Sequence, residues 1–184
     1  AKNDAGDVAG LLIAFGADVN AKDKDGKTPL LVATEEGSDD VAELLIVKRA
    51  DVKARDNAGR TPLQWAVTEN SDDVADLLIF KGANVKAEDK DGRTPLHAAA
   101  AKGYEPTAEL LIAKGAEVNA RDKSGRTPLH AAAAEGCVQV AELLIAKGAD
   151  VNTQDKAALT PLLSAEKGQF TKMIDLLKKH GARR

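Results

Sequence analysis

The chain is short of several residue types that often reveal what a protein does. A single cysteine, Cys137, excludes an intrachain disulfide framework. Aromatic residues make up only 3% of the 184 residues, which suits thin, closely packed helix pairs better than a thick core. A net charge of −3 argues against a nucleic-acid partner recognised through overall charge. There is no long uncharged apolar run and no signal-like N-terminus, so we expect no membrane insertion and a reducing compartment, the cytoplasm or, in a eukaryote, the nucleus.

What the chain does contain is a regular repeat. A Thr-Pro-Leu motif recurs every 33 residues, beginning at Thr28, Thr61, Thr94, Thr127 and Thr160. A Gly-Ala pair recurs in the same register, at Gly16, Gly82, Gly115, Gly148 and Gly181, with Arg49-Ala50 in the remaining position. A fixed period of this length predicts a solenoid, in which stacked units share one continuous core.

Each unit has the pattern of a turn followed by two helices. Segments such as Asp89–Gly92 favour a turn, because Asp bonds the backbone just ahead of it and Gly allows positive φ. Thr then suits an N-cap and Pro the first helical position. First helices are therefore expected to begin at Pro29, Pro62, Pro95, Pro128 and Pro161. Ser38 and Ser71, each followed by two aspartates, are expected to cap second helices. Second helices are expected to end at a left-handed residue, which is a glycine such as Gly82 or Gly148 and, in one unit, Arg49.

The five phased copies of Thr-Pro-Leu, with their Asp-x-x-Gly turns and Gly-Ala pairs, resemble the ankyrin repeat family over essentially the whole chain. The resemblance implies an all-α fold, an ankyrin-repeat solenoid of stacked helix-turn-helix units joined by β-turn or hairpin-like loops. We divide a single domain, 1–184, into repeats accordingly. They are a partial N-terminal repeat (1–21), full repeats (22–54, 55–87, 88–120 and 121–153) and a C-terminal capping repeat (154–184).

The two ends of the array differ from its middle. At the C-terminus Lys178 replaces a recurrent Ile, the turn at 156–159 lacks Gly, and the first helix reaches a glycine one residue early, at Gly168, which predicts a polar cap. At the N-terminus a second helix near Asp7–Phe15 has no first helix before it. We expect the natural chain to continue upstream of Ala1, or this first helix to have been removed.

Few residues offer chemistry. His97 and His130 lie one unit apart, and adjacent helices pack about 8–10 Å apart, too far for one zinc ion. The family resemblance instead implies that each bonds the nearby Thr as a local stabiliser. Cys137 lies at a helix start that could lower its pKa, but no base or orienting group accompanies it. We therefore expect no metal, no cofactor and no catalysis.

Charge marks the candidate contact surface. The residue after each turn glycine is basic, at Lys27, Arg60, Arg93 and Arg126, so stacking predicts a basic ridge that either keeps the array soluble or contacts a partner with little effect on folding. Trp65 is expected to fill the core rather than to anchor a partner, and Tyr104 is the better candidate for an exposed aromatic. The predicted partner-binding residues are Lys24, Lys27, Arg60, Lys90, Arg93, Tyr104, Lys123 and Arg126.

An acidic group lies at the other end of the first two full units. Its members are Glu35, Glu36, Asp39, Asp40, Glu69, Asp72 and Asp73. These acidic residues are interpreted either as helix caps or as an acidic docking patch, and capping is the favoured interpretation.

These observations favour a monomeric module that binds a protein or peptide through its turn tips and first helices, the surface that ankyrin-like proteins typically use. The alternative is an engineered or consensus-derived scaffold without a physiological ligand. Drift between units, as at Thr68-Glu69-Asn70 and Arg49, speaks against design.

Overall fold

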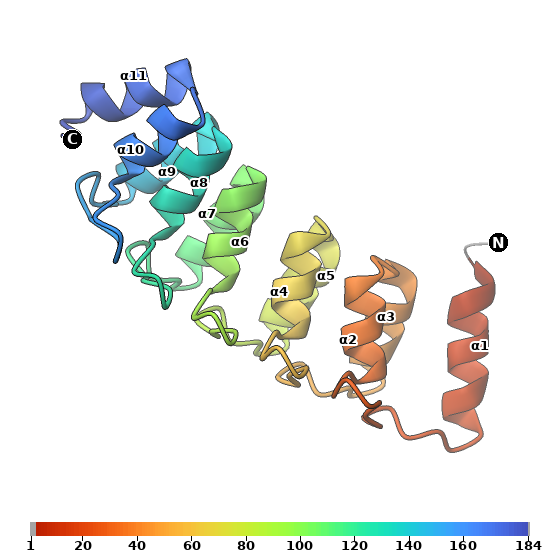
Figure 1. The fold of residues 1–184 in the computed structure, drawn as a ribbon. Helices are drawn as coiled ribbons and strands as arrows, with labels where there is room; N and C mark the ends of the chain where they lie inside the picture. Colours follow the sequence, from red (N-terminus) through yellow and green to blue (C-terminus); the bar gives the residue numbers. More distant parts are fainter. Residues whose placement is uncertain (1–2, 184) are drawn as a thin grey trace. The chain divides into compact units, whose positions relative to one another are not determined.

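The computed structural model describes residues 3–183, and within that range the regular structure is helical throughout (Figure 1). The all-α prediction is confirmed. Two compact units, Ala1–Asn84 and Val85–Arg184, are described in turn. The first unit contains α1 (Asn3–Ala14), α2 (Pro29–Glu35), α3 (Asp39–Val47), α4 (Pro62–Thr68) and α5 (Asp72–Phe80). The second contains α6 (Pro95–Lys102), α7 (Glu105–Ala113), α8 (Pro128–Glu135), α9 (Val138–Ala146), α10 (Pro161–Lys167) and α11 (Thr171–Lys179).

The first helices begin where the Thr-Pro motif predicts. Thr61 has extended backbone, and its side-chain oxygen accepts the N–H of Gln64 at 3.3 Å. Gln64 returns the bond, since its Oε1 accepts the Thr61 N–H at 3.0 Å. This capping box satisfies two N–H groups that the helix itself cannot, while Pro62 occupies the first turn without losing a bond.

The second helices are capped differently from the prediction. Ser38 and Ser71 occupy the N-cap positions of α3 and α5, but neither hydroxyl makes a capping hydrogen bond. Their ψ angles of 73° and 76° resemble those of Tyr104 (85°) and Cys137 (80°) at the same position. The tight turn between paired helices therefore sets this conformation whatever the residue, and the predicted hydroxyl cap is wrong. The aspartates do lie in the first turns of α3 and α5, where their negative charge interacts favourably with the positive end of the helix dipole.

The second helices end as predicted, in a left-handed residue. Gly82 and Gly148 have φ of 88° and 90°, and Arg49 has φ of 67°. The last first helix, α10, ends at Gly168, but this glycine is not the left-handed residue. Gly168 has φ of −79°, and the left-handed residue is Gln169, with φ of 58°. The left-handed residue thus stays at the same position of the repeat although the glycine lies one residue earlier. Moving the helix end by one residue would misplace the buried side chains of α11.

The core of each unit follows the first helices. Leu30 and Leu63 are fully buried in the first unit, and Leu96 and Leu129 in the second. Buried alanines let successive first helices pack side by side, α2 on α4 and α6 on α8. In the last repeat Met173 and Leu177 are buried while Lys178 is exposed, as the predicted polar cap requires.

Candidate partner-binding surface

Each turn tip is held by one aspartate. In the first unit Asp56 Oδ1 accepts the N–H groups of Ala58 at 2.8 Å and Arg60 at 2.9 Å. In the second unit Asp122 does the same for Ser124 and Arg126, each at 2.9 Å. Two bonds to one carboxylate oxygen fix the tip backbone before any partner arrives.

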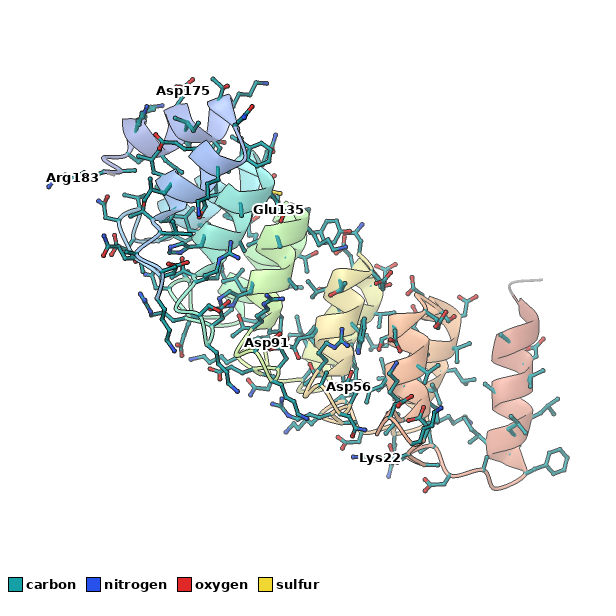
Figure 2. The ribbon with its side chains drawn as sticks, viewed as in Figure 1. Lys22, Asp56, Asp91, Glu135, Asp175 and Arg183 are labelled. Atoms are coloured by element: carbon teal, nitrogen blue, oxygen red, sulfur yellow. The ribbon has the colours of Figure 1, made fainter. Side chains whose placement is uncertain are left out.

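Neighbouring tips are also bonded to each other. The Asn57 N–H donates to the Asp25 carbonyl at 3.0 Å in the first unit. In the second unit the Lys123 N–H donates to the Asp91 carbonyl at 2.8 Å, and the Lys156 N–H donates to the Ser124 carbonyl at 2.9 Å. Figure 2 shows Asp91 at this turn end of the second unit and Glu135 at the opposite end of the helices. The tips within each unit therefore form a preorganised row.

Exposed lysines occupy the outermost position of the row. Lys24 is exposed in the first unit, and Lys90 and Lys123 are exposed in the second. Lys156 follows Lys123 in the same register and is exposed as well. The sequence analysis missed Lys156, although its position one period after Lys123 could have revealed it.

The four predicted ridge residues contact their own scaffold. Lys27 forms an ion pair with Glu35, and Arg60 covers the Trp65 ring, with its guanidinium carbon 3.9 Å from the centroid. In the second unit Arg93 Nε lies 4.0 Å from Asp122 Oδ2, and Arg126 Nη2 donates to the His130 carbonyl at 3.5 Å. Lys27, Arg60 and Arg126 are half-buried as well as paired, so we expect these three to contribute to the fold, whereas the side chain of the fourth, Arg93, is exposed. The exposed tip lysines are the more available contacts.

Trp65 lies in the core, as expected. Only 9% of its surface is exposed, and it clusters with Leu31 and Ala54. Its indole N–H donates to Asp56 Oδ2 at 3.3 Å, so the turn aspartate also satisfies the polar edge of this aromatic. Trp65 therefore joins first helix to turn and is not offered to a partner.

His97 and His130 are structural, as the resemblance implies. His97 Nδ1 accepts the Thr94 N–H at 3.2 Å, and its Nε2–H then donates to the Arg126 carbonyl at 3.1 Å. His130 repeats this geometry with Thr127 and the Leu159 carbonyl. Burial lowers the pKa of both imidazoles, which keeps them neutral. Each histidine caps its own helix and bonds the next repeat.

The comparison with known families decides the identity of this fold. The family model described as "Ankyrin repeats (3 copies)" matches residues 1–89 and 77–155. The chain belongs to the ankyrin repeat family. Ankyrin repeats are generally modules for protein–protein interaction, and they are generally non-catalytic.

A curated mouse protein matches a short stretch of this chain. It is the "Fibronectin type 3 and ankyrin repeat domains 1 protein" of Mus musculus, 81% identical over 26 residues. That segment covers 14% of this chain and 8% of the mouse protein. The chain thus matches only a small fraction of this relative's length.

Tyr104 is less exposed than the sequence analysis expected. It is half-buried at the N-cap of α7. The exposed aromatics lie in the first unit, where Phe15 and Phe80 are 88% and 81% exposed. Phe80 ends α5 on its outer side, one period after Val47, which is 67% exposed. The sequence carried this signal, because alanine fills the same position at Ala113 and Ala146.

Cys137 is a half-buried thiol at the start of α9. The expectation that the helix start lowers its pKa is wrong, because burial raises the pKa of the Cys137 thiol and nearby Glu135 raises it further. A thiol of this kind is a poor nucleophile at neutral pH.

Within residues 3–183, no three His, Cys, Asp or Glu side chains are grouped so that they could hold a metal ion. None of the described helices combines the length and apolar character needed to cross a membrane.

Proposed function

We propose that this ankyrin-repeat chain is a non-catalytic module that binds a protein or peptide partner through its turn tips and first helices. The carrying observation is the row of tips within each unit, in which bonded backbone presents Lys24 in the first unit and Lys90, Lys123 and Lys156 in the second. A rigid row loses little conformational freedom on binding, so contacts made by it convert efficiently into affinity.

The charge of the last two tips favours an acidic segment in the partner. Lys123 and Lys156 are followed by uncharged Ser124 and Ala157, whereas the lysines of the other two tips are each followed by an aspartate that offsets their charge. Exposed cations mainly accelerate association with an acidic partner and add modestly to affinity. We further propose that the repeats serve as one domain and that the chain acts as a monomer in a reducing compartment.

Backbone strain argues against the alternative of a designed scaffold. Arg49, Ala158 and Gln169 all hold positive φ, at 67°, 58° and 58°. A consensus or engineered array would place glycine at such positions. The strain therefore supports a natural chain over a designed one.

The test needs a partner and a matched pair of variants. Affinity capture with mass spectrometry supplies the partner. One variant changes Lys24, Lys90, Lys123 and Lys156 to Glu, and the control changes Lys48, Lys81, Lys114 and Lys147, which are exposed at the ends of second helices, to Glu. Both variants alter net charge equally, so non-specific electrostatics cancel. We expect the turn-tip variant to slow association about tenfold or more and to reduce its salt dependence.

The two variants must also be compared for folding. Exposed lysines contribute little to stability, so both melting curves should match that of the parent chain. Loss of the partner in the second-helix variant, with binding retained in the turn-tip variant, would place the binding surface on the second helices and reject this proposal.

A further inference from the structure

The outer face of the second helices in the first unit carries two large, exposed apolar side chains. Val47 ends α3 and Phe80 ends α5, and they are 67% and 81% exposed. They lie one period apart, on helices that contact each other in the stack. Adjacent helices pack about 8–10 Å apart, so Val47 and Phe80 together form one apolar patch at the same end of neighbouring helices.

The exposure of this patch does not arise from a missing neighbour. The equivalent residue of α9, Ala146, is also exposed, although both α7 and α11 pack on α9. Stacking of further repeats therefore does not cover this position. Alanine at Ala113 and Ala146 also shows that the repeat needs no large side chain there. Lys81 Nζ lies 5.5 Å from the centroid of the Phe80 ring, yet the ring stays open to solvent.

Carboxylates stand on the same face, one and two turns before the patch. They are Asp40 and Glu43 in α3 and Asp73 and Asp76 in α5, and all are exposed. Residues three, four or seven positions apart share one helix face, so each helix presents two carboxylates followed by a large apolar side chain. Neither helix contains a lysine or an arginine.

The second unit lacks this combination. Its helices α7 and α9 keep the middle carboxylate, at Glu109 and Glu142, but Pro106 and Gln139 replace the first aspartate, and alanine replaces the large apolar residue. In α11 lysine takes both the first and the last of the three positions. An acidic first turn favours the helix dipole by itself, so that role does not explain the apolar side chain at the other end of α3 and α5.

We propose that this face binds a basic amphipathic helix of a partner protein, which crosses α3 and α5 with its apolar side on Val47 and Phe80. An α-helix rises 1.5 Å per residue, so apolar residues seven positions apart are about 10 Å apart and match the spacing of the patch. Lysine or arginine side chains along one edge of that apolar side then reach Glu43 and Asp76, which lie about 6 Å before the patch.

The chemistry of the face favours this occupant over others. The backbone of α3 and α5 is already bonded within each helix, so the face offers side chains and no free backbone groups to an extended strand. Nucleic acid and anionic lipid would be repelled by the carboxylates. A second copy docked through the same face would bring like charges together.

The probe is a synthetic, helix-stapled peptide of about 15 residues, with two leucines seven positions apart and arginines along one edge of the same face. Titrated into the nitrogen-15-labelled chain, it should shift the amides of Glu43, Val47, Asp76 and Phe80. Binding should weaken as salt is added, because exposed ion pairs are screened. One control peptide has glutamate in place of arginine, and another has its leucines on the opposite face. Neither should shift these amides.

Variants of the chain assign the apolar part of the site. Phe80→Ala installs the residue that the second unit carries at this position, and it should weaken peptide binding about tenfold or more. The melting temperature should stay unchanged, because the ring is exposed in the folded chain. A merely structural role of Phe80 would instead lower the melting temperature.

A matched pair of variants assigns the acidic part. Glu43→Gln with Asp76→Asn should weaken binding and remove most of its salt dependence. Glu109→Gln with Glu142→Gln removes the equivalent carboxylates of the second unit and should leave binding unchanged. Both double variants alter the net charge equally, so a difference between them reports the position of the charge.

Several results would overturn the proposal. They are unchanged binding in Phe80→Ala or in the Glu43 and Asp76 variant, equal binding of either control peptide, and absence of shifts at millimolar peptide. Self-association in sedimentation that Phe80→Ala abolishes would do the same, because the occupant would then be a second copy. The tip lysines take no part in this test, and their proposed partner is acidic rather than basic, so failure here would leave the turn-tip proposal intact.

Discussion

The guanidinium of Arg60 lies over Trp65, with 3.9 Å between the guanidinium carbon and the ring centroid. Asp56 completes the arrangement, since its Oδ2 accepts the indole N–H at 3.3 Å and lies 3.5 Å from Arg60 Nε. Turn, cation and core aromatic are thus joined within one repeat. Arg60 therefore contributes to folding in a way that the exposed tip lysines do not.

Replacing Arg60 should destabilise the chain measurably. Arg60→Glu removes the cation–π contact and places a carboxylate beside Asp56, so we expect a loss of about 1–2 kcal/mol in the free energy of unfolding. Urea denaturation followed by circular dichroism measures it. Lys24→Glu, at the exposed tip of the preceding repeat, is the control and should change stability by less than about 0.5 kcal/mol. Equal effects of the two changes would show that Arg60 is only a surface charge.

Arg49→Gly should stabilise the first unit. Arg49 has φ of 67°, and a side chain in this region costs about 1 kcal/mol. A side chain at this position gains no packing contact through its Cβ, because a Cβ placed on the equivalent Gly16 or Gly82 meets nothing within 4 Å. The variant should melt several degrees higher in calorimetry. An unchanged or lower melting temperature would mean that the Arg49 side chain offsets its backbone strain through a contact in solution.

Ala158 allows a similar gain in the second unit, and Gly92 provides the contrast. Both have positive φ at the same turn position, at 58° and 77°. A Cβ at Gly92 would lie 2.9 Å from the backbone nitrogen of Lys123 in the next turn, whereas Ala158 lies in the last turn. Ala158→Gly should therefore stabilise by about 1 kcal/mol, and Gly92→Ala should destabilise by more than that. If the two substitutions change stability by similar small amounts of opposite sign, the turn after Gly92 moves easily to make room for the Cβ.

Stability should fall as the pH drops from 7 to 5.5. Burial lowers the pKa of His97 and His130 below the usual 6.5, so below pH 6.5 the unfolded chain binds more protons than the folded chain. The free energy of unfolding then decreases by up to about 1.4 kcal/mol per histidine per pH unit as pH falls towards the folded pKa values.

A double variant isolates this effect. His97→Gln with His130→Gln should flatten the profile, because Gln64 forms the same capping box without titrating. His180→Gln, at an exposed position, should leave the profile unchanged. A slope that persists in the double variant would have to come from other groups.

The amides of α1 should exchange faster than those of α9. Each helix in the array is stabilised by its neighbours, and α1 packs mainly on α3, whereas α9 packs on α7, α8 and α11. Hydrogen exchange should show lower protection for Val8–Phe15 than for Val140–Ala146. Equal protection would mean that α1 is covered in solution, for example by a second chain.

The sequence alone determined the repeat and the starts of the first helices, and its resemblance to a known family implied the all-α fold and the structural role of the histidines. The helix starts depend on local chemistry, since Thr caps, Pro begins a helix and Asp closes a turn within a few residues. A strict period of 33 residues then repeats each local solution in every unit.

Only the tertiary structure decided the features that depend on neighbouring repeats. Gln169 rather than Gly168 takes the left-handed position because the stacked helices fix the register, and burial rather than the helix start sets the pKa of Cys137. The sequence suggested that Arg60 is a surface charge, because Trp65 is five residues away along the chain and only the fold brings its indole beneath the guanidinium.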